Sequence, residues 1–193
     1  MINLILFGPP GAGKGTQSAK LIEKYSLTHI STGDLFRKHL KEGTPLGKLA
    51  QDYMNKGNLV PDKVVIDMVD DKISHSGKMD GIIFDGFPRT IPQAEALDDL
   101  LEQKGAPIKI LLELVVPEDE LRKRLADRAL KENRPDDAKP QVIENRISVY
   151  KAETAAVAEH YKKLNKYSSV VGVGGVEDIF KNICVEIDKR LLV

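Results

Sequence analysis

The sequence predicts an α/β fold in which a parallel β-sheet is covered by helices. Short aliphatic runs alternate with longer segments of helical periodicity, and this alternation is typical of βαβ units. The first run, Ile2–Phe7, carries one polar residue and stops at a glycine, as a buried parallel strand does. The last segment places its apolar residues on one helical face, so it should pack back on the sheet. The 193 residues suffice for one domain with a substantial core.

The elements between these two ends follow in chain order. After a Gly/Pro-rich loop, apolar residues recur at helical spacing, first in a helix that contains Ala19, Ile22 and Tyr25. Two more helices are predicted at Pro45–Lys56 and Asp62–Ile73. Aliphatic runs predict further strands at Ile82–Phe84, Ile110–Val116 and Ser169–Val173.

The C-terminal half is predicted from its prolines and its last apolar face. Pro117 is expected to start a helix. The segment Ala129–Pro140 is polar and twice interrupted by proline, so we expect an exposed loop there. The apolar face of the final helix, which Cys184 widens, comprises Val176, Ile179, Phe180, Ile183, Ile187 and Leu191.

Composition excludes several classes of protein. Lys plus Arg and Asp plus Glu each number 29, so no overall basic field exists to hold nucleic acid or an anionic membrane. The single cysteine, Cys184, can form neither an internal disulfide nor a four-cysteine zinc site. No apolar stretch approaches the about 18 residues that span a bilayer, and no basic leader precedes Ile2. We therefore expect one cytoplasmic domain over residues 1–193 whose anion binding is local.

A phosphate-binding loop follows the first strand. Residues 8–16 are Gly-Pro-Pro-Gly-Ala-Gly-Lys-Gly-Thr, and they stand between a strand and a helix, as such a loop requires. Glycines let backbone N–H groups turn towards a polyphosphate, whose outer phosphates Lys14 can reach. Gly15 intervenes before the hydroxyl of Thr16, which weakens a generic GTPase assignment. An ordinary Gly/Pro turn is the alternative, but it does not explain the lysine at this offset. The residues predicted to bind phosphates are Gly11, Ala12, Gly13, Lys14, Gly15 and Thr16.

Two further segments narrow the class of protein. They are Ser31–Arg37, Ser-Thr-Gly-Asp-Leu-Phe-Arg, and Asp85–Ala94, Asp-Gly-Phe-Pro-Arg-Thr-Ile-Pro-Gln-Ala. The Gly-Lys-Gly-Thr variant of the loop resembles the nucleoside monophosphate kinases, and all three segments together resemble the adenylate kinases. The resemblance extends from Met1 to the final helix. It implies a three-layer P-loop kinase fold with a five-stranded parallel sheet, a helical AMP-binding insert at about residues 31–60 and a short lid at about residues 128–138.

The resemblance also implies an activity and an AMP site. The activity is reversible transfer of a phosphoryl group from Mg²⁺-bound ATP to AMP, giving two ADP, by a monomer. Arg37 and Arg89 offer bidentate forks to an AMP phosphate, and the Gln93 amide can pair with an adenine edge through one donor and one acceptor. Alone, a surface arginine is usually a solvated charge, so the motifs carry this assignment. The implied AMP residues are Thr32, Arg37, Asn58, Leu59, Val60, Gly86, Phe87, Pro88, Arg89, Gln93, Arg134 and Arg146.

Two more residues are assigned by resemblance, each with an alternative. Asp85 ends a hydrophobic strand and resembles the acid that holds magnesium through water in P-loop enzymes, whereas a helix cap is the alternative. Gly174 follows the last strand and resembles a backbone contact to the ATP base, and a plain strand-ending turn is its alternative.

Arginines near the predicted lid complete the implied site. Arg128 should lie nearer ATP, while Arg134 and Arg146 should reach both phosphate chains. Only five residues separate Arg128 from Arg134, so the folded lid of longer relatives, which sometimes holds zinc, is lacking and no structural zinc is expected. Asp136 and Asp137 could pair with these arginines, although adjacent acids in a polar loop are more often solvated.

The acceptor phosphate is already anionic, so no general base is needed. Catalysis should depend on positioning, magnesium and a cationic cluster, and a lid that closes over both nucleotides should exclude water. The four histidines show no metal-ligand or nucleophile–base spacing, and all are expected to be structural or exposed: His29, His39, His75 and His160. The implied catalytic residues are Lys14, Arg89, Arg128, Arg134 and Arg146.

Two rival functions remain open at this point. A uridylate/cytidylate kinase would share the phosphate loop, the short lid and Asp85–Arg89, but Thr32 and Gln93 resemble the adenylate pattern. A non-catalytic ATP-binding switch would leave the insert and Gln93 without a role. Stimulation of ADP formation by AMP, UMP, CMP or GMP would discriminate among the three.

Overall fold

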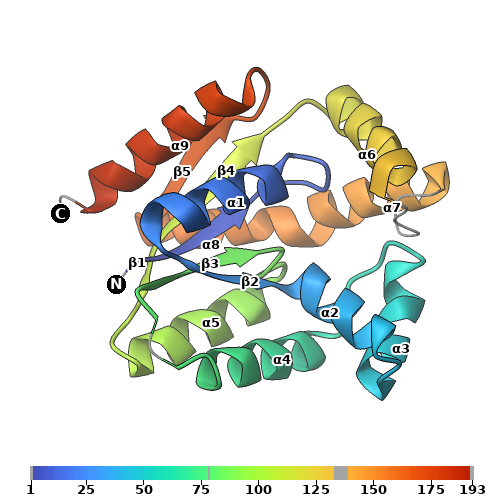
Figure 1. Cartoon of the computed structure of the whole chain (residues 1–193), viewed down its shortest axis with the longest axis horizontal. Helices are drawn as coiled ribbons and strands as arrows, with labels where there is room; N and C mark the ends of the chain where they lie inside the picture. Colours follow the sequence, from blue (N-terminus) through green and yellow to red (C-terminus); the bar gives the residue numbers. More distant parts are fainter. Residues whose placement is uncertain (1, 78, 133–138, 192–193) are drawn as a thin grey trace.

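A five-stranded parallel sheet forms the centre of the molecule. The computed structural model describes residues 2–77, 79–132 and 139–191 (Figure 1). Its strands have the order β2-β3-β1-β4-β5, and every neighbouring pair is parallel. The predicted α/β class and five-stranded parallel sheet are therefore confirmed. The strands are β1 (Ile2–Phe7), β2 (Thr28–Ser31), β3 (Gly81–Asp85), β4 (Ile108–Val115) and β5 (Tyr167–Val171).

Helices cover both faces of this sheet. In Figure 1, α9 and α1 lie on one side of the strands, and α4 and α5 lie on the other. None of the helices in the described part of the chain is long and apolar enough to cross a membrane. The helices are α1 (Lys14–Tyr25), α2 (Thr32–Lys41), α3 (Pro45–Met54), α4 (Asp62–Ser74), α5 (Ile91–Gln103), α6 (Glu118–Glu132), α7 (Pro140–Val149), α8 (Ala155–Lys163) and α9 (Val176–Leu191), with a π-helical turn η2 (Tyr150–Thr154) between α7 and α8.

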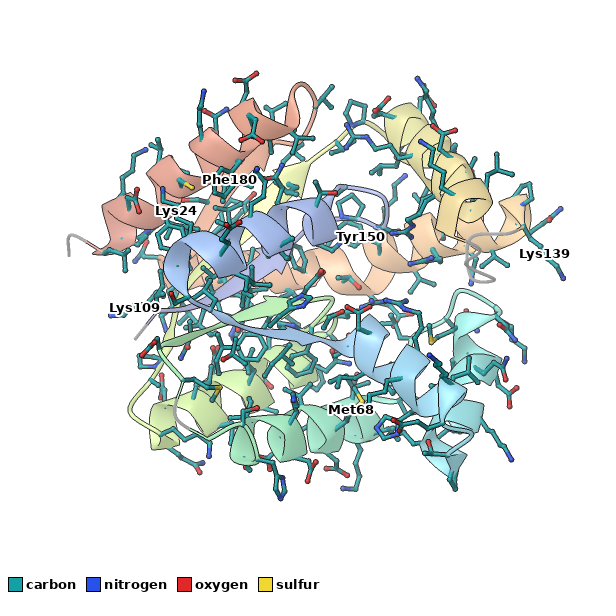
Figure 2. The ribbon with its side chains drawn as sticks, in the orientation of Figure 1. Lys24, Met68, Lys109, Lys139, Tyr150 and Phe180 are labelled. Carbon is teal, nitrogen blue, oxygen red and sulfur yellow. The ribbon has the colours of Figure 1, made fainter. Side chains whose placement is uncertain are left out.

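The central strand shows how the two layers of core form. Successive side chains of a strand point to opposite faces, so Leu4 and Leu6 pack with α1 and α9, while Ile5 and Phe7 pack with α4, α5 and α8. Every residue of β1 is buried, as expected for a strand covered on both faces. Burying one such aliphatic side chain contributes about 1.5–3 kcal/mol. Lys20 of α1 also lies over the ring of Phe180 of α9, 5.1 Å from its centroid, and Figure 2 labels Phe180 beside Lys24.

Several predicted boundaries differ from the structure. β2 was not predicted as a separate strand, and its four residues are held by pairing with β3. β5 begins at Tyr167, two residues earlier than predicted, because Tyr167 and Ser168 pair with β4. The loop predicted from Ala129 is wrong at its start, since α6 continues to Glu132. Ala129, Leu130 and Lys131 favour helix, and the first proline comes only at residue 135. Residues 133–138 lie outside the described residues.

The topology determines where a ligand can bind. The carboxyl ends of parallel strands lie at one edge of the sheet, and the chain leaves β1 towards β2 but leaves β4 towards β5. In open α/β sheets, ligands bind where neighbouring connections diverge in this way. Here that place lies between β1 and β4, and residues 8–13, which join β1 to α1, lie beside it.

Candidate functional site

A cleft of about 790 Å³ opens at the carboxyl edge of the sheet. This volume is within the usual range of small-molecule sites, about 300–1,000 Å³. The cleft brings together nearly all of the residues that the sequence assigns to nucleotides. Those that line it are Gly11, Ala12, Gly13, Lys14, Gly15, Thr16, Thr32, Arg37, Asn58, Leu59, Val60, Asp85, Gly86, Phe87, Pro88, Arg89, Gln93, Arg128 and Arg146.

The phosphate loop ends at the N-terminus of α1. Gly13 is the N-cap residue and has φ 96°, a left-handed conformation that favours glycine. No side chain caps the first turn, so its backbone N–H groups and the positive end of the helix dipole are available to an anion. The Lys14 ammonium donates to the carbonyl oxygens of Gly8, at 2.7 Å, and Pro9, at 3.0 Å. Lys14 is thus folded against the loop that it follows.

The electrostatics around Lys14 reveal a cationic cluster. Burial is the main cause that lowers the pKa of Lys14 from its usual 10.5 to about 8. The charge of Asp85 acts in the opposite direction, and the charges of Arg89, Arg146 and Arg128 lower the pKa further. Four cations from four different segments therefore act on one region beside a single carboxylate. Such a region attracts a polyanion.

The second half of the cleft is organised around the carbonyl of Gly86. This oxygen accepts hydrogen bonds from the Thr32 hydroxyl, at 2.8 Å, and from Nε of Arg89, at 2.7 Å. Gly86 has φ 75°, and a Cβ at this position would lie 3.0 Å from Nη2 of Arg89 and 3.3 Å from Oγ1 of Thr32. Glycine therefore lets the arginine approach the backbone. The arrangement joins the start of α2 to the segment after β3.

Arg37 reaches the same cleft from α2, where it forms an ion pair with Asp34. Burial acts to raise the pKa of the Asp34 carboxyl, but the Arg37 guanidinium outweighs it and the pKa is lowered. The pair lies three residues apart on the helix, at a spacing that brings side chains together. Arg37 is thereby held beside the opening of the cleft.

The amide of Gln93 is fixed at both ends. Its oxygen accepts from the backbone N–H of Arg89 at 2.8 Å, and its nitrogen donates to Oδ1 of Asp62 at 2.8 Å. The same carboxylate oxygen accepts from the Thr90 hydroxyl at 2.9 Å. Gln93 is only 2% exposed, yet it lines the cleft. Its orientation is consequently set by the protein.

α7 contacts the segment that follows α3. The Asn145 amide nitrogen donates to the carbonyl oxygen of Lys56, at 2.6 Å, and to Oδ1 of Asn58, at 2.8 Å. Arg146, the next residue, faces the cleft. Two segments that are 87 residues apart in sequence thus form adjoining walls of the site.

Gly174 does not line the main cleft; it lines a smaller cavity of about 290 Å³ together with Ala12, Gly13 and Thr16 of the phosphate loop. Arg134 lies outside the described residues, as do Asp136 and Asp137. The predicted lid, at about residues 128–138, is described only where it belongs to α6.

The structure adds cleft residues that sequence reasoning missed. His29 of β2 lines the cleft, with its Nε2 3.8 Å from Oδ2 of Asp85, so it is not merely a structural residue away from the site. The Tyr150 ring packs 5.7 Å from that of Phe7, and its hydroxyl donates to Glu113 at 3.0 Å. Tyr150 lies inside the molecule in Figure 2, whereas Lys139 projects from its edge. The position of His29, two residues before Ser31, was a usable signal, but no motif marks Tyr150.

Oxygen donors in the cleft suit a hard cation. Within the described ranges, no group of three or more His, Cys, Asp or Glu side chains is placed to hold a metal by itself. Asp85 and Thr16 nevertheless both line the cleft. Magnesium prefers oxygen ligands, usually one or two from the protein, with water and substrate phosphates completing its shell. The donor set therefore fits a magnesium ion that arrives with a polyphosphate.

Comparison with known proteins identifies close relatives. The family model described as adenylate kinase matches residues 6–166. An adenylate kinase of Bacteroides fragilis is 45% identical over 188 residues, which cover 97% of this chain and 99% of that protein. The adenylate kinase of Bacteroides thetaiotaomicron is 44% identical over 98% of this chain and 100% of its own, and that of Porphyromonas gingivalis is 46% identical over 98% and 97%.

Proposed function

The chain belongs to the adenylate kinase family, and from this membership we propose that the main cleft holds both of its nucleotides, with their phosphates meeting beside Lys14. The chain is an ATP:AMP phosphotransferase, and the family uses ATP with magnesium. These facts decide between the three functions that the sequence left open. What we propose here is the role of each residue.

ATP is proposed to bind at the phosphate loop. The uncapped N-terminus of α1 and the Lys14 ammonium support this assignment, because both offer hydrogen-bond donors and positive charge to phosphate oxygens. Arg128 contributes charge to the same region. The ATP base is proposed to lie towards Gly174, whose cavity shares Ala12, Gly13 and Thr16 with the loop.

AMP is proposed to occupy the half of the cleft beyond Asp85. Arg37 and Arg89 would bind its phosphate, and the backbone of residues 58–60 and the Gln93 amide would enclose its base. The helical insert at about residues 31–60 would therefore act as the AMP-binding unit. Arg146, whose charge acts on Lys14, would reach both phosphate chains.

The proposed mechanism needs no proton transfer. The AMP phosphate is anionic before it attacks, so the residues must orient two polyanions in line and balance their charge. Lys14, Arg89, Arg128 and Arg146 supply that balance, and Arg134 is proposed to join them. Asp85, through water, and Thr16 would hold magnesium, which supplies further positive charge to the phosphates. The short lid is proposed to exclude water from the reacting groups. The expected monomeric state and cytoplasmic location stay predictions.

Arg89→Ala tests the division of the cleft. The single observation that carries the proposal is that Nε of Arg89 donates to the Gly86 carbonyl, which also accepts from Thr32 at the start of α2, so Arg89 is anchored on the side of the cleft formed by the insert. Removing its guanidinium should weaken AMP binding by about 2 kcal/mol or more, because a charge-assisted bidentate contact to the AMP phosphate is lost. The affinity for ATP should change far less. Isothermal titration with each nucleotide measures both affinities.

A matched control is Arg190→Ala. Arg190 donates to the backbone of Asn165 at the far end of α9 and does not line the cleft, so its removal should leave both affinities unchanged. Equal losses of AMP and ATP affinity in Arg89→Ala would show that the two halves are assigned wrongly.

A further inference from the structure

The Asp62 carboxylate accepts a hydrogen bond from the Gln93 amide. Asp62 is the first residue of α4 and follows the proposed AMP-binding backbone of residues 58–60 by two positions. Its Oδ1 accepts from both the Gln93 amide and the Thr90 hydroxyl, at 2.8 and 2.9 Å. Asp62 itself does not line the cleft, whereas Gln93 does. Asp62 therefore contacts Gln93 from the side that is turned away from the cleft.

The chemistry of these partners permits one orientation of the Gln93 amide. An ionised carboxylate can only accept hydrogen bonds, so the group facing Asp62 must be the NH₂ group. The backbone N–H of Arg89 can only donate, so the group facing it must be the carbonyl oxygen. If the amide were flipped, its oxygen would face a carboxylate and its NH₂ group would face an N–H. Two attractive contacts would become repulsive.

The fixed amide has one hydrogen and one lone pair left for a base. An adenine edge offers one donor, its exocyclic amine, and one acceptor, a ring nitrogen, and a glutamine amide matches this pair. On the edge that carries N1, a 6-oxopurine held by the same ribose and phosphate offers an oxygen where adenine has the amine, and an N–H where adenine has the N1 lone pair. Binding through this edge would require the flipped amide. A site discriminates between ligands through such unfavourable contacts as well as through favourable ones.

We propose that Asp62 is a positioning residue that gives the monophosphate site its preference for adenine over 6-oxopurines by preventing the Gln93 amide from flipping. The inference rests on the proposed placement of AMP, and it extends that placement to a residue outside the cleft. Thr90 supports the arrangement, because its hydroxyl hydrogen is directed to Asp62 while its oxygen caps α5. Gln93, the third residue of α5, donates its backbone N–H to this cap, which orders its backbone.

Asp62→Asn is the decisive variant. Asparagine has nearly the same shape, but it can present either an oxygen or an NH₂ group, so at this position both orientations of Gln93 find a partner and only the Arg89 N–H still opposes the flip. We expect kcat/KM for AMP to fall, mainly through KM for AMP, with KM for ATP unchanged. The ratio of kcat/KM for IMP or GMP to that for AMP should rise about tenfold or more, as expected where hydrogen-bond complementarity sets specificity. A coupled ADP assay with each monophosphate measures these ratios.

Two further variants serve as controls for this test. Asp62→Glu keeps a group that only accepts, so the ratio should stay close to that of the unchanged protein even where KM for AMP rises. Asp67→Asn is the matched control, since Asp67 is exposed on the same helix, forms an ion pair with Lys63 and does not line the cleft. It should leave every parameter unchanged. A thermal melt of each variant confirms that it is folded at the assay temperature.

Gln93→Ala distinguishes failure of this inference from failure of the proposed site. If Gln93→Ala changes the ratio and Asp62→Asn does not, Asp62 has no positioning role, although the proposed site stands. If Gln93→Ala leaves the ratio unchanged, the assignment of Gln93 to the base is itself overturned. In the double variant, Asp62→Asn should add no further change to the ratio. An additive change would show that Asp62 acts independently of Gln93.

Discussion

Lys14 shows at the scale of one residue how the cleft is prepared for an anion. Its ammonium is buried, surrounded by arginine charges and opposed by one carboxylate, so its charged form is disfavoured. Its bonds to the carbonyls of Gly8 and Pro9 compensate only in part. Phosphate groups would stabilise the charged form. The energetic conflict in the free protein is therefore relieved by binding of a nucleotide.

This conflict predicts proton uptake on ATP binding. The pKa of Lys14 is about 8 in the free protein and should rise when phosphates surround it, so between these two values binding adds a proton. The affinity for ATP should accordingly fall as the pH rises above about 8. At pH 8.5 the phosphates are already fully ionised, since their second pKa is about 6, so the proton must go to the protein. Titration calorimetry in two buffers of different ionisation enthalpy measures the uptake.

Lys14→Arg provides the comparison for this experiment. An arginine stays charged throughout this pH range, so the variant should bind ATP without proton uptake, whatever its affinity. The lowered pKa of Lys14 also makes the free energy of unfolding depend on pH. The unfolded chain binds the proton up to its usual pKa of 10.5, so the destabilisation due to Lys14 diminishes as the pH rises from about 8 to 10.5. Absence of uptake at pH 8.5 in the unchanged protein would contradict the proposed contact.

At the scale of elements, α7 and the insert act as one wall of the cleft. Asn145 of α7 donates hydrogen bonds to both residue 56 and residue 58. The two elements come from opposite halves of the chain, so this contact depends on tertiary structure. Motion of α7 should therefore be coupled to the backbone proposed to hold the AMP base.

Asn145→Ala tests the coupling. Each lost hydrogen bond contributes about 1 kcal/mol, so amide hydrogen exchange in residues 55–60 should accelerate about tenfold or more, while exchange in the sheet stays unchanged. Hydrogen exchange followed by mass spectrometry resolves the two regions. Asn182→Ala, at an exposed position of α9, is the control and should change neither. Acceleration throughout the molecule would indicate general destabilisation instead.

Local patterns predicted some elements better than others. β1 was predicted correctly as a buried strand because its apolar residues are nearly consecutive. The face predicted for α9 is confirmed in the middle of the helix, where Ile179, Ile183, Cys184 and Ile187 are buried, but it is wrong at the two ends, where Val176 and Leu191 are exposed. β2 was not predicted, because four residues carry too little periodicity and its pairing with β3 decides its structure. The end of α6 was predicted too early. The prolines that follow it suggested a loop from residue 129, although residues 129–132 have high helical propensity.

The same distinction applies to the site. The phosphate loop and Asp85–Ala94 are each an unbroken stretch of sequence. Their motifs could therefore be recognised, and their residues assigned to one nucleotide site, before the structure was known. Tyr150 and Asp62 could not be found in this way, because only the packing of α4 and η2 against distant segments gives them their partners. The orientation of Gln93 likewise depends on a hydrogen bond across 31 residues.

At the scale of the whole molecule, the described residues form two large apolar clusters and one small one. The large clusters cover the two faces of the sheet. The small cluster joins α6 to α7 through Leu125, Ile143 and Ile147. Stability should therefore depend on the layers around the sheet more than on the arm formed by α6 and α7.

Two truncations of the same residue type test this difference. Ile183→Ala, in the layer between α9 and the sheet, should lower the free energy of unfolding by about 2–5 kcal/mol, because it leaves a cavity in a fully buried region. Ile143→Ala should cost less, since its cluster has three buried members and can relax. Urea denaturation measures both. Equal losses would mean that the arm is as integral to folding as the sheet.

The central place of β1 has a consequence for synthesis of the chain. β1 precedes its neighbours β3 and β4 by about 80 and 105 positions, since these lie at Gly81–Asp85 and Ile108–Val115. Contacts between residues so far apart form late, because a long loop must close before they stabilise anything. The nascent phosphate loop therefore lacks its complete sheet support until β4, which ends beyond the middle of the 193 residues, has left the ribosome. A loop that is translated before β3 and β4 can thus bind a nucleotide only after both have been made.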